Sequence, residues 1–250
     1  IAQLARRPIR ENEARALFSE LEFYRLVQEM PGTRPAPPTT SVEIVRERET
    51  LAAIARAVDD SRAVALVPAY QGVPCSGGLL GLVIALADGR TFYVPIGRGE
   101  HTVAVGILKE VLGPLIENPE VKKTGHDLKA LTQLLATQGM LLRGAEGDVE
   151  LLSYILNPSR REHALADLAR ERLSIEIPTF GPATGKRRRE GVDSISIDEA
   201  ANLFGAQADA VRRLAPLLWQ EADSVGVGKL ARDLEIPLVP VLAKMERVGI

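Results

Sequence analysis

The sequence contains little cysteine, few aromatic residues and no long apolar run. Cys75 is the single cysteine among 250 residues, which excludes a disulfide framework and a cysteine-rich zinc site and is typical of a reducing cytosol. No apolar run reaches the roughly 18 residues that a membrane span needs, and residues 1–10 lack the apolar core of a signal peptide. We therefore expect a cytoplasmic protein with no membrane partner.

The charges are nearly balanced, with 31 Lys and Arg residues against 33 Asp and Glu residues and a formal net charge of −2. Binding to a nucleic-acid backbone usually requires clustered positive charge, and the overall composition gives no such sign. The hydrophobic fraction of 46% and the length suffice for a large buried core. Composition alone thus predicts an α/β or α protein and says nothing about its function.

A proline-rich stretch at residues 31–40 divides the chain, with four prolines in ten positions. Proline fixes φ and has no N–H group, so we interpret this stretch as a semi-rigid linker. Residues 12–29 have the apolar spacing of an amphipathic helix. A single helix cannot bury its own apolar side, so we interpret this helix as the end of a larger unit that is truncated here. Ile1 in the first position also suggests that the natural start lies upstream.

Beyond the linker, short apolar segments alternate with helical patterns. Residues 63–67 form a continuous apolar run that stops at the next proline, as in a strand buried on both faces. The dipeptide Asp88-Gly89 predicts a tight hairpin turn, and Ser196 with Glu199 predicts a capping box at a helix start. We further expect strands at 42–45, 79–87, 91–96 and 121–123, helices at 49–59, 101–116, 128–135, 148–156, 164–173, 196–222 and 230–248, an exposed loop at 178–195, and a break at 223–228.

Four segments resemble parts of the bacterial DNA polymerase I family, the family A polymerases. Residues 142–157, LRGAEGDVELLSYILN, resemble a segment of the family's 3′–5′ exonuclease domain, and residues 123–129, KTGHDLK, resemble its K-x-G-x-N-L-K segment. Residues 235–249 are similar to the helix that enters the polymerase domain, and residues 14–30 to the helical tail after the 5′-nuclease domain. The resemblance covers nearly the whole chain in the family's order.

This resemblance implies an α/β, ribonuclease-H-like fold of the DnaQ-like exonuclease type, in which helices flank a mixed sheet. It also implies a helical tail at 1–30, a linker at 31–40, the exonuclease-like domain at 41–222, and the start of the polymerase domain at 223–250. Active family members bind two divalent metals through carboxylates in three motifs, and these metals activate a water that attacks the terminal phosphodiester.

In this chain the resemblance places a non-acidic residue at every expected ligand position. Pro68 and Tyr70 take the places of the first motif, Leu131 takes the ligand position of the second, and Leu203 and Gln207 take those of the third. Without a carboxylate cage, the charges of two metals would repel each other uncompensated. We therefore expect a degenerate domain that keeps the fold, with no catalytic residue and no bound metal.

Three aspartates leave a second interpretation open, a weakly active or non-catalytic single-stranded-DNA-binding exonuclease domain with substitute carboxylates. Asp127 stands at the Asn position of the second motif, Asp148 lies in the segment 142–157, and Asp209 lies two residues past the third motif. On the structural interpretation, Asp127 and Asp148 are helix N-caps and Asp209 pairs with Arg212 or Arg213.

Other chemically active side chains offer weaker patterns. His101, His126 and His163 have no metal-binding spacing, so we expect no zinc site. Cys75 lies in a loop rich in glycine, proline and serine without a base nearby in the sequence, so we expect no nucleophile there.

The densest positive cluster comprises Lys186, Arg187, Arg188 and Arg189 in the expected loop. Contact with a DNA backbone would give these residues a weak, salt-dependent and sequence-independent affinity. The alternative is a solvated loop that contacts nothing.

By resemblance, the parent polymerase performs template-directed DNA synthesis in replication and repair with Mg²⁺ as its cofactor. This implies DNA and the intramolecular polymerase domain as partners, a monomeric state, and a place in the cytoplasm at the nucleoid. We expect the apolar stripe of residues 230–248 to lie against the polymerase domain. The exonuclease-like domain would then be a structural platform without a cofactor of its own.

Overall fold

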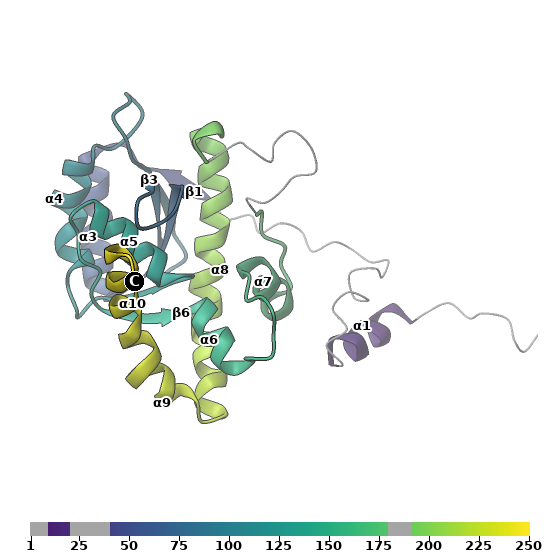
Figure 1. Cartoon of the computed structure of the whole chain (residues 1–250). Helices are drawn as coiled ribbons and strands as arrows, with labels where there is room; N and C mark the ends of the chain where they lie inside the picture. Colours follow the sequence, from purple (N-terminus) through teal and green to yellow (C-terminus); the bar gives the residue numbers. More distant parts are fainter. Residues whose placement is uncertain (1–9, 21–40, 180–191) are drawn as a thin grey trace, which may run out of the picture. The chain divides into compact units, whose positions relative to one another are not determined.

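A six-stranded mixed sheet lies at the centre of the unit that spans residues 37–250 (Figure 1). The computed structural model describes residues 10–20, 41–179 and 192–250. The strand order is β1-β4-β3-β2-β5-β6, and β3 runs antiparallel to both of its neighbours while the other pairs are parallel. The strands are β1 Val42–Ile44, β2 Ala63–Gln71, β3 Gly78–Leu86, β4 Thr91–Pro95, β5 Lys122–Gly125 and β6 Ala145–Asp148.

Helices cover the sheet in two layers, each with its own apolar core. One core joins the sheet to α3 Arg48–Ser61, α4 Val105–Ile116 and α5 Leu128–Thr137. The other core joins it to α6 Val149–Leu156, α7 Leu165–Leu173 and α8 Ile197–Ser224. A short 3-10 turn, η3 Val192–Ser194, precedes α8. This arrangement confirms the expected mixed sheet flanked by helices.

Strand β2 is buried on both faces, as its apolar run predicts. Val64 and Leu66 enter one core while Ala65 and Val67 enter the other, because successive side chains of a strand point to opposite faces. The prediction that this strand ends at Pro68 is wrong, since β2 continues to Gln71 opposite β3. The pairing of β2 with β5 stops at Ala65, so the edge of β2 on that side is unpaired beyond this residue. Pro68 is tolerated there because no neighbouring strand needs its missing N–H group.

Local signals in the sequence place several other elements correctly. The hairpin between β3 and β4 turns at Asp88-Gly89, where Gly89 has φ of 97°. The capping box of Ser196 and Glu199 is present at the start of α8. Helix α4 begins at Val105, later than expected, and β6 was not expected at all because its AEGD sequence has no apolar run.

The C-terminal segment packs against the same unit as the sheet. It comprises α9 Gly228–Leu230, the π-helical turn η4 Ala231–Glu235 and α10 Ile236–Val248. The expected continuous helix over 230–248 is therefore interrupted by a wide turn. Pro237 follows this turn and lacks the N–H group that a regular helix would bond to the carbonyl of Asp233.

The other unit, residues 1–36, contains helix α1 Glu11–Glu20. This helix confirms the first part of the helical pattern predicted for 12–29, and the rest of that pattern lies outside the described residues, as does the linker at 31–40. Within the described parts of the chain, no helix has both the length and the apolar character to cross a membrane.

Candidate functional site

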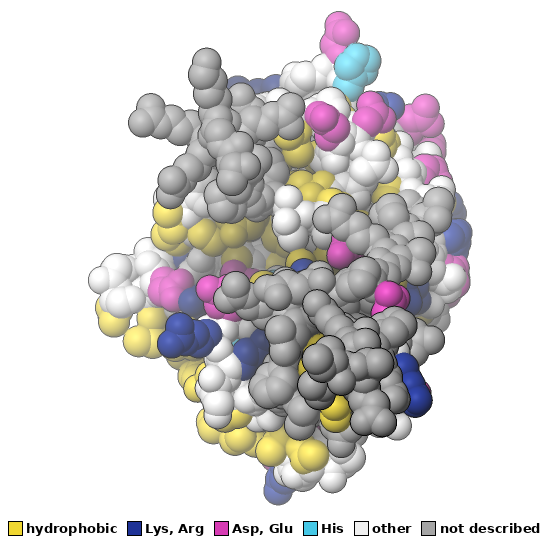
Figure 2. All heavy atoms as spheres, turned by 90° about the vertical axis from the view of Figure 1, so that its right-hand side faces the viewer, with side chains coloured by type: hydrophobic (Ala, Val, Ile, Leu, Met, Phe, Trp, Pro, Cys, Tyr) yellow, Lys and Arg dark blue, Asp and Glu magenta, His cyan; other side chains and the backbone are white. Residues whose placement is uncertain are grey.

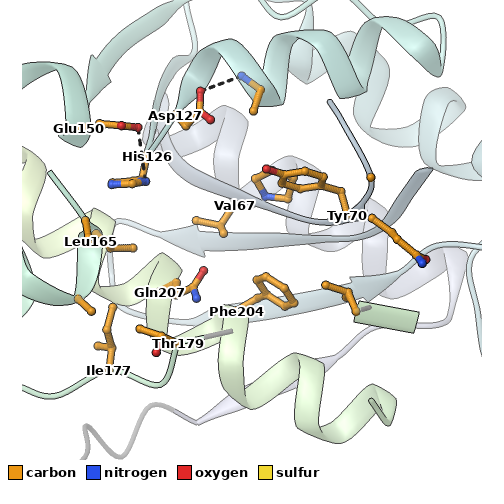
Figure 3. Close-up of a pocket in the computed structure, with 17 residues that line it drawn as sticks. Val67, Tyr70, His126, Asp127, Glu150, Leu165, Ile177, Thr179, Phe204 and Gln207 are labelled. Carbon is orange, nitrogen blue, oxygen red and sulfur yellow. Dashed lines mark hydrogen bonds and ion pairs between the residues drawn. The ribbon is translucent and has the colours of Figure 1, made fainter. Parts of the chain in front are cut away.

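A cavity of about 660 Å³ lies beside the C-terminal half of β2, where α5, α6 and α8 meet (Figure 3). Tyr70 reaches into it from β2, Phe204 and Gln207 from α8, and Asp127 and Glu150 from the starts of α5 and α6. The other residues of its wall are Val67, Pro68, Gln71, Gly72, His126, Ala130, Ala164, Leu165, Ala166, Ile177, Thr179 and Val192.

Three of the five positions that the resemblance assigns to the catalytic motifs line this cavity. Pro68 and Tyr70 come from β2, and Gln207 comes from the middle of α8. Leu131 and Leu203 do not line it, since each is buried in one of the two apolar cores. Their chain neighbours Ala130 and Phe204 line the cavity instead. A leucine side chain that can reach an apolar core is more stable buried in that core than at the wall of an open cavity.

Asp127 begins α5 and confirms the predicted N-cap. Its Oδ1 accepts a hydrogen bond from the N–H of Ala130 at 3.0 Å, and its own backbone is left-handed with φ of 59°. Aspartate tolerates this conformation because its short side chain bonds the nearby backbone. The cap therefore holds one carboxylate at the cavity wall.

Glu150 supplies a second carboxylate that the sequence analysis did not select. It lies in the first turn of α6, where an acidic residue interacts favourably with the helix dipole, and this position was the available signal. Burial raises the pKa of Glu150, with smaller contributions in the same direction from Asp127 and Asp148. His126 opposes this shift, since its Nδ1 lies 4.0 Å from Glu150 Oε2.

Asp148 caps two helices at once. It accepts hydrogen bonds from the N–H groups of Glu150 at 3.0 Å and Leu151 at 3.3 Å, which confirms the predicted cap of α6. It also accepts bonds from the N–H groups of Asp127 at 3.2 Å and Leu128 at 2.7 Å, at the start of α5. Burial raises the pKa of Asp148, and the N–H groups of Leu128 and Leu151 oppose that shift. This carboxylate positions the helix starts and does not line the cavity.

Asp209 confirms the predicted ion pairing on α8. Its carboxylate lies 3.2 Å from Arg212 Nε and 3.6 Å from Arg213, and only 7% of the residue is exposed. It is absent from the cavity wall. Of the three aspartates considered as substitute ligands, only Asp127 thus lines the cavity.

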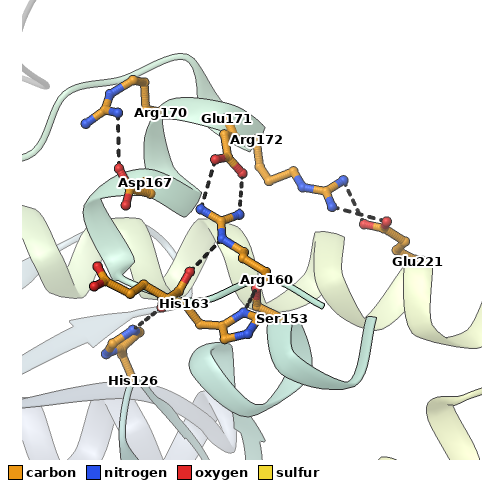
Figure 4. A network of polar contacts seen from close by, with 10 residues as sticks. His126, Ser153, Arg160, His163, Asp167, Arg170, Glu171, Arg172 and Glu221 are labelled. Carbon is orange, nitrogen blue, oxygen red and sulfur yellow. Dashed lines mark hydrogen bonds and ion pairs between the residues drawn. The ribbon is translucent and has the colours of Figure 1, made fainter. Parts of the chain in front are cut away.

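A polar network behind the cavity fixes the connection between α6 and α7 (Figure 4). His126 Nε2 lies 3.0 Å from the carbonyl oxygen of His163, whose Nδ1 lies 2.8 Å from Ser153 Oγ. Arg160 binds Glu171 through two bonds of 2.6 and 2.9 Å. The fold brings together two histidines that are far apart in the sequence, but as structural partners of backbone and hydroxyl groups.

The remaining predicted side chains lie elsewhere. Cys75 is half-buried in the loop between β2 and β3, and His101 is exposed in the loop before α4. Lys186, Arg187, Arg188 and Arg189 lie outside the described residues.

The cavity does not suit the two-metal centre that the fold family implies. Hard divalent cations need several oxygen ligands, and Asp127 and Glu150 are the two carboxylates among the wall residues that the structure describes. Among the described residues, no group of three or more His, Cys, Asp or Glu side chains is arranged to hold a metal ion. We therefore derive no chemical step through a metal.

Comparisons with known proteins agree with this geometry. Residues 82–179 match the family model of the ribonuclease H-like domain of DNA polymerase I. The DNA polymerase I of Pseudomonas aeruginosa is 26% identical over 254 residues, which cover 94% of this chain and 28% of that polymerase. The DNA polymerase I of Bacillus subtilis is 31% identical over 146 residues, which cover 58% of this chain and 16% of that polymerase. The chain thus spans less than a third of the length of these relatives.

A solved structure supports the same fold. The POL domain of Pol1 from M. smegmatis, in complex with a DNA primer-template and a dNTP, superposes with a TM-score of 0.68 at 24% identity, over 84% of this chain and 32% of that chain. At this sequence identity, the superposition supports the fold of the chain and not its activity.

Proposed function

Since this chain carries a 3′–5′ exonuclease-like domain of the bacterial DNA polymerase I family, we propose that the domain keeps the ribonuclease H-like fold and no longer hydrolyses DNA. The observation that carries this proposal is the cavity beside β2. Three of the five positions that the resemblance assigns to the motifs line it, and these hold Pro68, Tyr70 and Gln207 in place of carboxylates.

The substitute carboxylates do not restore the lost chemistry. Two-metal hydrolysis needs carboxylates that hold both ions against their mutual repulsion while one ion activates the attacking water. Asp148 is saturated by four backbone N–H groups, and Asp209 is paired with two arginines outside the cavity. In the described part of the wall, Asp127 and Glu150 are the carboxylates that are left, and one of the two oxygens of Asp127 caps α5.

We expect the protein to release no mononucleotides from 3′-labelled single-stranded DNA in Mg²⁺ or Mn²⁺, because no metal cage activates water. Electrophoresis of the labelled products measures this, with an active relative as the positive control. Metal-dependent release that Asp127→Ala abolishes and Asp209→Asn leaves intact would contradict the proposal and support residual activity. Release that neither variant changes would point to a contaminating nuclease, which a second purification removes.

For the longer protein we propose template-directed DNA synthesis in replication and repair, with Mg²⁺ held by its polymerase domain. The support is that the curated relatives are DNA polymerases I of which this chain matches less than a third. In this proposal the exonuclease-like domain is a platform for the polymerase domain, within a monomeric protein that acts on DNA in the cytoplasm at the nucleoid.

Helix α10 offers the surface for such an intramolecular partner. Ile236, Val239 and Ala243 bury a narrow face in the domain, and Glu246 binds Lys129 at 2.7 Å and Gln133 at 2.6 Å on α5. Around this anchor, nine large apolar side chains are exposed: Val225, Leu230, Leu234, Leu238, Val241, Leu242, Met245, Val248 and Ile250. Apolar atoms are likewise exposed at the lower end of Figure 2, the end where Figure 1 places α9. An apolar surface this extensive is typical of an interface.

We expect the double variant Leu238→Ser and Leu242→Ser to leave the melting temperature of residues 1–250 nearly unchanged. In this chain the two residues are 38% and 39% exposed. In the full-length polymerase the same pair should cost about 2 kcal/mol of stability, since the side chains would be buried. Val239→Ser is the control and should destabilise both forms. Calorimetry measures the effects, and a full-length protein indifferent to the pair would contradict the interface.

A further inference from the structure

The cavity beside β2 is open, although positions in its wall that the resemblance assigns to metal ligands hold other residues. Its 660 Å³ falls within the range of pockets that bind small molecules. Its wall is mostly apolar, with a few polar groups at defined places, which is the composition of a ligand site. The question is therefore which chemical class of ligand suits the groups that are left.

The charge of the wall selects against anions. Asp127 and Glu150 line the cavity, Asp148 lies directly behind them, and among the wall residues that the structure describes none is a lysine or arginine. The nearest basic side chain on α5, Lys129, is turned to Glu246 at 2.7 Å. With no metal cage to neutralise these carboxylates, a phosphate entering the cavity would meet like charge at short range.

The aromatic residues favour a cation in the same space. Tyr70 from β2 and Phe204 from α8 flank the cavity on two sides, with Gln207 between Phe204 and the carboxylate side (Figure 3). Ring faces attract an ammonium or guanidinium group, and a nearby carboxylate strengthens that attraction. The apolar side chains of Val67, Leu165 and Ile177 would accommodate an alkyl chain attached to the cation.

We propose that this cavity binds an organic cation, a guanidinium or primary ammonium group on a short alkyl chain, and rejects nucleotides. The cation would lie between the two rings and pair with Glu150, while the amide oxygen of Gln207 would accept one of its N–H groups. The rejection of nucleotides rests on the proposed loss of the metal centre, whereas the attraction for the cation rests on Tyr70, Phe204 and Glu150 themselves. Such a cation occurs both in free amines and in the arginine or lysine side chains of a peptide.

Isothermal titration calorimetry of the whole chain with n-butylguanidinium tests the proposal. Its uncharged isostere N-butylurea and the anion thymidine 5′-monophosphate serve as comparison ligands. We expect the guanidinium to bind at least tenfold more tightly than either, and its affinity to fall as salt rises. Equal binding of butylurea, or tighter binding of the nucleotide, would overturn the proposal.

Variants of wall residues test whether the guanidinium binds in this cavity. Glu150→Gln should weaken guanidinium binding about tenfold and Tyr70→Leu about threefold or more, because each removes one attraction. Glu146→Gln, which changes a carboxylate paired with Lys122 outside the cavity, should leave binding unchanged. Melting temperatures check that each variant is folded. Affinity that is indifferent to Glu150→Gln in a folded protein would place the cation elsewhere and overturn the proposal.

A second ligand distinguishes the two sources of the cation. Acetyl-Gly-Arg-Gly-amide presents the same guanidinium on a backbone. Tighter binding of the peptide than of butylguanidinium would support an arginine side chain of a protein partner. Binding of the free guanidinium alone would support a small amine, and both results would support the cation site.

Discussion

Asp148→Asn should lower the free energy of unfolding by about 3 kcal/mol, because a buried carboxylate that accepts four N–H groups would become an amide. In place of Oδ1, the amide oxygen can keep the bonds from Asp127, Glu150 and Leu151, but the NH₂ group then meets the N–H of Leu128, which needs an acceptor. The start of α5 thus faces a donor, and the other three bonds lose the carboxylate charge, which explains why the effect exceeds that of an ordinary N-cap. Urea unfolding followed by circular dichroism measures it.

Asp127→Asn is the matched control for this prediction. It changes a cap with a single hydrogen bond, to Ala130, keeps a side chain that tolerates the left-handed backbone, and should cost less than about 1 kcal/mol. A similar loss in both variants would show that Asp148 acts as an ordinary cap of α6 and that its bonds to α5 contribute little.

Lys123→Met should stabilise the protein by about 2 kcal/mol at pH 7. Lys123 is completely buried on β5, and it donates a hydrogen bond to the carbonyl oxygen of Asn118. Burial lowers its pKa from 10.5 to about 8, so at pH 7 the folded state must hold a charged ammonium group away from water. A shift of this size corresponds to about 3 kcal/mol, part of which the lost hydrogen bond offsets.

The stabilisation by Lys123→Met should depend on pH. Between pH 8 and 10.5 the unfolded chain binds more protons at Lys123 than the folded protein does, so this group makes the wild type more stable as the pH rises through that window. The difference in unfolding free energy between Lys123→Met and wild type should therefore shrink from pH 7 to pH 10. Lys122→Met, on the same strand but exposed and paired with Glu146 at 2.7 Å, should show no such trend. A constant difference over this range would contradict the role assigned to burial.

Lys123 and Asp148 lie in different parts of the structure that positions the cavity wall. Lys123 lies on the strand that leads to α5, and Asp148 ties the start of α5 to the start of α6. These helix starts present Asp127 and Glu150 to the cavity. The hydrogen bonds that position these two carboxylates are thus present, although Pro68, Tyr70 and Gln207 in the same wall are not acidic.

Several features followed from local sequence because local bonds decide them. The turn at Asp88-Gly89 needs a residue that adopts positive φ, and the capping box of Ser196 and Glu199 closes within four residues. The caps at Asp127 and Asp148 likewise bond to N–H groups two or three residues ahead. The family resemblance was also readable, since its segments are contiguous in the chain.

Other features depended on neighbours that the sequence does not reveal. Strand β2 passes through Pro68 because β5 ends its pairing earlier, and β6 forms at AEGD because β5 offers it an edge. The motif alignment named Leu131 and Leu203, but core packing turns both inward and leaves Ala130 and Phe204 at the wall.

By itself, the sequence determined the resemblance to the DNA polymerase I family, the mixed α/β architecture and the non-acidic residues at the ligand positions that this resemblance assigns, since these depend on residue identity and order. Only the tertiary structure decided that Asp148 caps two helices, that Asp209 faces arginines, and that Glu150 joins Asp127 at an open, acidic and aromatic cavity. The physical reason is that burial, charge pairing and cavity shape arise from contacts between distant segments. A near-neutral chain can therefore contain a locally acidic site that its composition does not indicate.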